Sequence, residues 1–146
     1  MDVFEELTMW HLTHNGKVFV CPQFSIDGDW SVPDFVALDF EKHRVMVVEA
    51  SVAASPRGLF DKVKNRDNQW FARLRERLRQ RQVIDDSWAT FCVRLYIRTC
   101  AAEKLPPEIS AAKDVEICQL EQIAFPWSWE WESTKLRKEA EETGQP

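Results

Sequence analysis

Two apolar runs separated by a short polar tip constrain the fold of this chain more than any other feature. Residues 35–40 and 45–52 consist mostly of Val, Ala, Leu, Met and Phe, and the chain reverses between them at 41–44. Short apolar runs bounded by turn residues are typical of strands, so the pattern predicts an antiparallel hairpin. The second run is apolar on both faces, as expected for a strand near the middle of a covered sheet.

Each predicted hairpin strand carries a carboxylate at the same end of the sheet. Asp34 precedes the first run and Glu49 lies at the end of the second. Oxygen ligands that converge at a strand end suit Mg²⁺ or Mn²⁺, which keep some waters and share their shell with substrate phosphate. A glutamate on such a strand is costly to desolvate unless it is paired or coordinated. The implied chemistry is phosphodiester hydrolysis.

Pro33-Asp34, the hairpin and Glu49-Ala50 together resemble the PD-(D/E)XK nuclease superfamily. Its signature is Pro-Asp, a hairpin spacer, and then an acidic residue, any residue and lysine; the lysine position is Ser51 here. The resemblance covers roughly residues 1–100. It implies a restriction-endonuclease-like α/β sandwich and a metal-dependent DNA endonuclease. Asp34, Glu49 and the Ala50 carbonyl would then hold Mg²⁺ or Mn²⁺.

The resemblance also suggests residues outside the hairpin. Some members carry the lysine on the following helix, where Lys62 is favoured because it aligns with Gln69, and a helix glutamine often accompanies the site. A glutamate of the first helix often joins the metal, which favours Glu6 because it borders the apolar face of that helix. The alternatives are that Lys62 is a surface lysine and that Glu6 is a favourable charge near a helix N-terminus.

The remaining pattern predicts one α/β domain with a central mixed sheet flanked by helices, in the order αβββαβαβ. The core is expected at about 1–123, and 124–146 is a Trp-rich C-terminal extension with a helical tail. Helices are predicted at 2–14, 56–82 and 108–113, and strands at 17–24, 35–40, 45–52, 88–100 and 115–123.

Charge is distributed unevenly along the chain. The formal net charge is −5, which argues against bulk attraction to nucleic acid. Residues 57–82, however, contain nine basic and three acidic residues. A basic stripe on an acidic body can contact phosphates, with Lys64, Arg66 and Arg73 as the candidates, or it can be a solvated helix face.

Other motifs carry weaker signals. The four cysteines are interpreted as reduced core thiols, since none has the close spacing of a zinc site. His11 and His14 are interpreted as surface residues rather than metal ligands. Trp127, Trp129 and Trp131 alternate along the tail and either stack on bases, bind a partner chain or seal the edge of the core.

The chain lacks an apolar run long enough for a membrane span and the positive N-terminal region of a signal peptide, so a soluble cytoplasmic protein is expected. DNA is the expected partner, with a protein partner or a homodimer supplying specificity. One alternative is a nuclease-like fold without catalysis that binds protein or nucleic acid. Another is the nuclease subunit of a larger complex.

Overall fold

The computed structural model describes residues 3–14, 16–22, 24 and 33–123. Its elements follow in the order α1 (Val3–Thr13), β1 (Val18–Pro22), β2 (Phe35–Asp39), β3 (Arg44–Ser51), α2 (Arg57–Lys64), the π-helix η1 (Asp67–Phe71), α3 (Ala72–Gln80), β4 (Thr90–Ile97), α4 (Thr99–Ala102), α5 (Pro107–Ser110) and β5 (Val115–Gln119). None of the described helices is long and apolar enough to cross a membrane.

The five strands form one mixed sheet in sequential order, β1-β2-β3-β4-β5. The first three strands pair antiparallel, whereas β4 and β5 run parallel to β3. A parallel neighbour requires a crossover connection. The segment α2-η1-α3 makes the crossover from β3 to β4, and the short helices α4 and α5 lie between β4 and β5.

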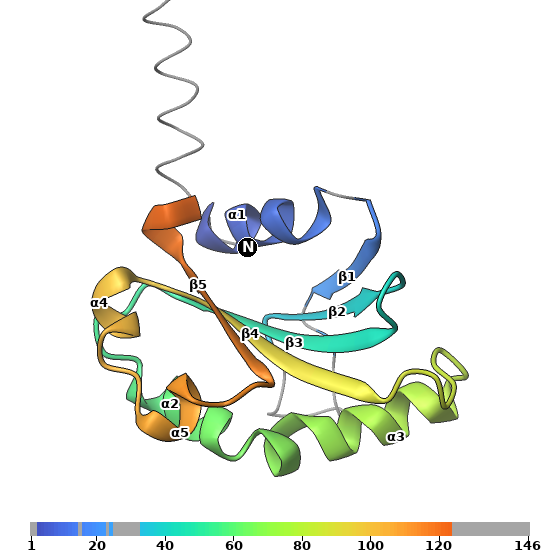
Figure 1. Ribbon diagram of the computed structural model, residues 1–146. Helices are drawn as coiled ribbons and strands as arrows, with labels where there is room; N and C mark the ends of the chain where they lie inside the picture. Colours follow the sequence, from blue (N-terminus) through green and yellow to red (C-terminus); the bar gives the residue numbers. More distant parts are fainter. Residues whose placement is uncertain (1–2, 15, 23, 25–32, 124–146) are drawn as a thin grey trace, which may run out of the picture.

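Helices cover both faces of the sheet (Figure 1). Helix α1 lies on one face, and α2, η1 and α3 lie on the other. The alternation along β3 matches these two layers: Val45 and Val47 pack toward α2 and α3, whereas Met46 and Val48 pack toward α1. All four side chains are at most 1% exposed. The prediction of a central strand that is apolar on both faces is thus confirmed, as is the mixed α/β class.

The predicted long helix 56–82 is wrong as one continuous element, because α2 ends at Lys64. The Asn65 N–H is shared between the carbonyls of Asp61 and Lys62, which tightens the last turn. The chain then continues through η1, in which the Ala72 N–H reaches back to the Asp67 carbonyl. The extra residue in this wide turn accompanies the burial of two adjacent aromatic side chains, Trp70 and Phe71.

Two predicted strands are also shorter in the structure. Strand β4 ends at Ile97, since Thr99–Ala102 is helical, and β5 ends at Gln119, since residues 120–123 are helical. The Glu121 carboxylate accepts the Thr99 N–H, and the Gln119 side chain contacts the Thr99 hydroxyl. These contacts hold the two strand ends together. The tail, including its tryptophans, lies outside the described residues.

Candidate functional site

The register of β2 and β3 brings Asp34 and Glu49 together. The last strand pair is Phe35 opposite Val48, so the next residues outward, Asp34 and Glu49, come level with each other. Their neighbours Val36 and Val47 pack toward α2 and α3. By the two-residue period of a strand, both carboxylates therefore lie on that face. The prediction that they share one end of the sheet is confirmed.

Asp34 closes the hydrogen-bond ladder at this end. Its Oδ2 accepts the Ala50 N–H at 2.8 Å, in the place where a backbone carbonyl would stand if β2 continued. A backbone N–H near the core requires a partner, so the carboxylate both caps the strand and is fixed by it. The N–H and C=O of one strand residue point to the same side. The Ala50 carbonyl therefore also faces the Asp34 side.

Glu49 is a carboxyl group in surroundings that disfavour its charge. Burial, the negative charge of Asp34 and a hydrogen bond between the two side chains raise its pKa to about 9. The positive charge of Lys62 acts in the opposite direction. In the protein without a cation, Glu49 therefore holds a proton at neutral pH and hydrogen-bonds to the Asp34 side chain.

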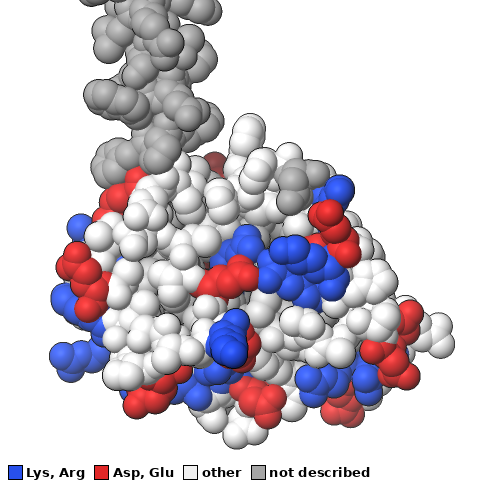
Figure 2. All heavy atoms as spheres, viewed as in Figure 1, with Lys and Arg blue, Asp and Glu red and all other residues white. Residues whose placement is uncertain are grey.

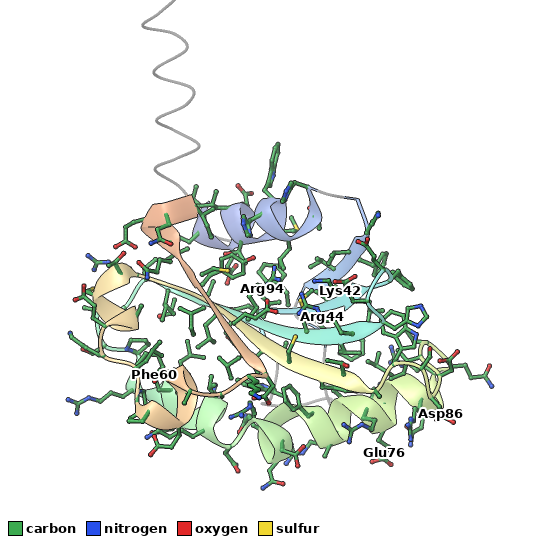
Figure 3. The ribbon with its side chains drawn as sticks, in the orientation of Figure 1. Lys42, Arg44, Phe60, Glu76, Asp86 and Arg94 are labelled. Carbon is green, nitrogen blue, oxygen red and sulfur yellow. The ribbon has the colours of Figure 1, made fainter. Side chains whose placement is uncertain are left out.

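Lys62 reaches this pair from α2. The helix begins at Arg57 after the buried Pro56, and the side chains of Phe60 and Val63 anchor it against the sheet. Phe60 is visible on the α2 side of the sheet in Figure 3. Lys62 itself is exposed, and its charge acts on Glu49. We define the candidate site as Asp34, Glu49, Ala50 and Lys62.

The oxygen donors of the candidate site fit a magnesium-like ion that keeps some of its waters. They do not fit an ion whose ligands all come from the protein. Among the described residues no three His, Cys, Asp or Glu side chains form a group that could hold a metal. Mg²⁺ commonly uses one or two carboxylates and completes its octahedron with waters and substrate phosphate. Two adjacent carboxyl groups, between which a cation could replace the proton of Glu49, match that pattern together with a backbone carbonyl.

Glu6 lies apart from the candidate site. Helix α1 packs on the face of the sheet opposite α2. Glu6 is exposed there and lines an apolar hollow with Leu7 and Trp10. The structure thus places the sheet between Glu6 and the two carboxylates.

Gln69 and Arg73 lie beyond the break at Asn65. Gln69 is a half-buried residue of η1, and Arg73 is a half-buried residue in the first turn of α3. The predicted alignment of Gln69 with Lys62 assumed an uninterrupted helix, and that assumption is wrong. Both residues stay on the same side of the sheet as the candidate site, on the following helical segments.

Arg66 is held within the protein by a residue that sequence reasoning missed. Its Nε and Nη2 donate to the two carboxylate oxygens of Asp114, each at 2.6 Å. This pair raises the pKa of Arg66 and lowers the pKa of Asp114. The exposed Lys64 lines the same hollow as Arg66 and Asp114. The guanidinium of Arg66, which was predicted to bind phosphate, is therefore already engaged by Asp114. In the sequence, Asp114 was recognisable only as an acid directly before the predicted strand 115–123.

A second polar cluster that the sequence reading missed lies on the α1 side of the sheet. Glu116 accepts hydrogen bonds from Arg44 and Arg94, which come from β3 and β4. Figure 3 labels both arginines between the sheet and α1. Close by, His11 Nδ1 lies 2.7 Å from the Tyr96 hydroxyl. Burial, and then the charge of Arg94, lower the pKa of His11. His11 is thus half buried against the sheet, and His14 is exposed.

The four cysteines are not joined in disulfides in the described part of the chain. Cys92 is buried, and Cys21, Cys100 and Cys118 are half buried. Burial raises the pKa of Cys92 to about 11, so that thiol stays protonated at neutral pH. The interpretation as thiols placed in or near the core agrees with this arrangement.

Comparison of the chain with protein-family models, curated proteins and solved structures found no match. The candidate site is therefore judged by its residues and geometry.

Proposed function

We propose that the protein is a metal-dependent nuclease that hydrolyses phosphodiester bonds in DNA. One observation carries the proposal: Asp34 and Glu49 lie side by side at the end of the β2–β3 pair, within the electrostatic reach of Lys62. The α/β architecture, with a hairpin that holds the carboxylates and a helix that follows it, supports a fold of the PD-(D/E)XK nuclease type.

Each residue of the candidate site has a role in this proposal. Asp34 and Glu49 bind Mg²⁺ or Mn²⁺, and the Ala50 carbonyl supplies a third protein oxygen. The Ala50 N–H holds the Asp34 carboxylate in one orientation. A bound divalent cation would lower the pKa of water and stabilise negative charge on the phosphate. Lys62 positions the attacking water and offsets charge in the transition state.

Lys62 takes the role of the lysine that the resembled signature places at Ser51. The Ser51 hydroxyl accepts the Ala53 N–H in the loop after β3 and brings no positive charge to the carboxylates. Lys62 brings that charge from α2, so the chemistry would retain its cation although the lysine stands elsewhere in the sequence. Glu6 has no role in this arrangement.

DNA is the proposed substrate because of the basic composition of residues 57–82. The exposed Lys64 and the half-buried Arg73 flank the helical segment that follows Lys62. Elsewhere both signs of charge are interspersed, as the view in Figure 2 illustrates. Contacts of this kind bind the backbone and carry no base sequence information. Sequence preference would then come from a protein partner or a second copy.

Cleavage of plasmid, linear, single-stranded and branched DNA with Mg²⁺ or Mn²⁺ tests the proposal. Asp34→Asn, Glu49→Gln and Lys62→Met should each reduce cleavage at least about a hundredfold, a typical loss for an electrostatic catalytic group. Lys42→Met is the matched control, because Lys42 is exposed at the opposite end of the hairpin. Full activity in purified Asp34→Asn would contradict the assignment.

A second candidate function is a nuclease-like module that binds protein or nucleic acid without cutting it. The serine at position 51 and the presence of only two carboxylates among the described residues of the candidate site favour it. Magnesium distinguishes the two functions, because a ligand that binds only the folded state raises its stability. A melting temperature unaffected by millimolar Mg²⁺ or Mn²⁺, with no cleavage of any substrate, would favour the non-catalytic module.

A further inference from the structure

The loop after strand β3 joins the two halves of the candidate site. It comprises residues 52–56, between the strand that carries Glu49 and the helix α2 that carries Lys62. Its end at Pro56 is buried, whereas residues 52–55 are exposed. Burial therefore does not fix these four residues, although their conformation determines how Lys62 is placed relative to Glu49.

A lysine from a distant part of the chain fastens this loop. The Lys104 ammonium donates to the Ala54 carbonyl at 3.3 Å and to the Ser55 hydroxyl at 3.0 Å. The sheet explains how the lysine comes there. Strands β3 and β4 run parallel, and their last pair is Ser51 opposite Ile97. The connections that follow the two strands therefore start level with each other, and the connection after β4 reaches the loop after β3.

The backbone that carries Lys104 is itself anchored. It lies in the turn after α4, where the Lys104 N–H donates to the carbonyl of Ala101, a fully buried residue. The next residue, Leu105, packs against the core cluster on the α2 side of the sheet. Lys104 is thus an exposed side chain on a fixed base. Its hydrogen bonds to the loop have a charged donor, which makes them stronger than bonds between neutral groups.

We propose that Lys104 is a positioning residue of the nuclease, which holds the loop so that Lys62 stays beside the carboxyl pair of the candidate site. That role rests on the proposed function. A misplacement of about 1 Å in a catalytic site can cost about a hundredfold in rate. Because Lys104 acts through the loop, its loss should disturb the placement of Lys62 without removing a group that binds the ion.

Steady-state cleavage of DNA by Lys104→Met tests this role. We expect kcat to fall about tenfold and KM to stay within about twofold, because the ion and the DNA still bind while the attacking water is less well placed. Lys104→Arg keeps a charged donor and should restore most of the kcat. Lys113→Met is the matched control, because Lys113 is exposed on the same connection between β4 and β5. It makes the same change in net charge and should leave kcat and KM as in the wild type.

Hydrogen exchange of the same variants gives a reading that does not depend on cleavage. The Phe60 N–H donates to the Pro56 carbonyl in the first turn of α2. In Lys104→Met this amide should exchange severalfold faster, because the loop that leads into the helix has lost its fastening. The Gln69 N–H donates to the Asn65 carbonyl and should keep its exchange rate, since η1 lies beyond the segment that the lysine holds.

The possible outcomes separate this role from the proposed function. A raised KM with unchanged kcat in Lys104→Met would show that Lys104 binds DNA directly, and it would overturn the positioning role. Unchanged kcat and KM, or unchanged exchange at Phe60, would also overturn it. In each of these cases the wild type still cuts DNA, so the proposed function stands. A wild type that cuts no DNA would overturn the proposed function and this role with it.

Discussion

Glu49 illustrates how a carboxyl group can be placed where its own charge is unfavourable. It lies on a strand whose neighbouring side chains are apolar, beside a second carboxylate, and burial is the largest cause of its raised pKa. Such an arrangement costs stability unless a proton or a cation neutralises it. Groups of this kind concentrate at functional sites, which is the physical reason to connect Glu49 with a ligand.

The stability of the metal-free protein should therefore fall as the pH rises from about 4.5 to about 9. Over this range the unfolded chain has lost the Glu49 proton, whereas the folded protein keeps it until the pH passes its pKa of about 9. One proton changes the free energy of unfolding by at most about 1.4 kcal/mol per pH unit. Urea unfolding with EDTA at pH 5, 7 and 8.5 measures the slope.

Glu49→Gln should remove most of that slope and make the metal-free protein more stable than the wild type at pH 8.5. The amide keeps the shape of the side chain and can still donate to Asp34. Glu103→Gln is the control. Glu103 is exposed and follows β4 and α4 in the chain, so its replacement should leave the pH profile unchanged. Parallel profiles for wild type and Glu49→Gln would contradict the buried proton.

Metal binding should release a proton from the same residue. A ligand carboxylate must be deprotonated, so at pH 7.5 the binding of Mn²⁺ should displace close to one proton from Glu49. Titration calorimetry in two buffers with different ionisation enthalpies measures this number. Binding without proton release, or unchanged binding by Glu49→Gln, would show that the ion binds elsewhere.

The carboxylate pair could be predicted from sequence because a short hairpin fixes its own register. The turn lies at residues 40–43, two residues from the expected register of a tip at 41–44, so that Asp39 pairs with Arg44 and Asp34 comes level with Glu49. The partner of Arg66 could not be predicted in this way. Asp114 is separated from it by 48 residues, and only the packing of the crossover against the start of β5 brings them together.

At the scale of elements, the interruption at Asn65 divides the crossover between β3 and β4 into two structural parts. Helix α2 carries Lys62 to the carboxylates, whereas η1 and α3 carry the buried row Trp70, Leu74 and Leu78. This row follows the helical period that predicted a helix at 56–82, because burial repeats with the turn. It could not predict the break, because a π-turn changes the register without changing the residue types that face the core.

The ion pair between Arg66 and Asp114 should stabilise this junction. The two side chains are 20% and 38% exposed, so the paired geometry should contribute only about 1 kcal/mol in a double-mutant cycle of Arg66→Gln and Asp114→Asn. Urea unfolding at low and high salt measures the coupling, which should shrink at 0.5 M KCl. Zero coupling at low salt would leave Arg66 available for other partners.

At the scale of the whole molecule, the sheet separates two different surfaces. The α2 and α3 side holds the carboxylate pair and the basic helical segments. The α1 side holds the Arg44–Glu116–Arg94 cluster and the exposed Val3 and Trp10 of α1. The layer order follows from the pattern of strands and helices in the sequence. The side of the sheet on which a polar residue lies depends on strand register and on helix breaks. The sequence therefore predicted the position of Asp34, which a hairpin fixes, better than the positions of Glu6 and Gln69, which lie on helices.

This division predicts how DNA binding should depend on charge. The net charge of −5 repels DNA, so attraction must come from local basic residues and should weaken steeply with salt. Lys64→Glu should raise KM severalfold at 50 mM KCl, leave kcat nearly unchanged, and lose most of its effect at 300 mM KCl, because Lys64 would contact phosphate and not the reacting group.

Lys42→Glu makes the same change in net charge at an exposed residue of the opposite hairpin end. If only the overall charge matters, both variants should raise KM equally. If DNA lies along the α2 and α3 side, Lys64→Glu should have the larger effect at low salt. A larger effect of Lys42→Glu would move the DNA to the α1 side, where Figure 3 places Lys42 with Arg44 and Arg94, away from the carboxylates that are proposed to cut it.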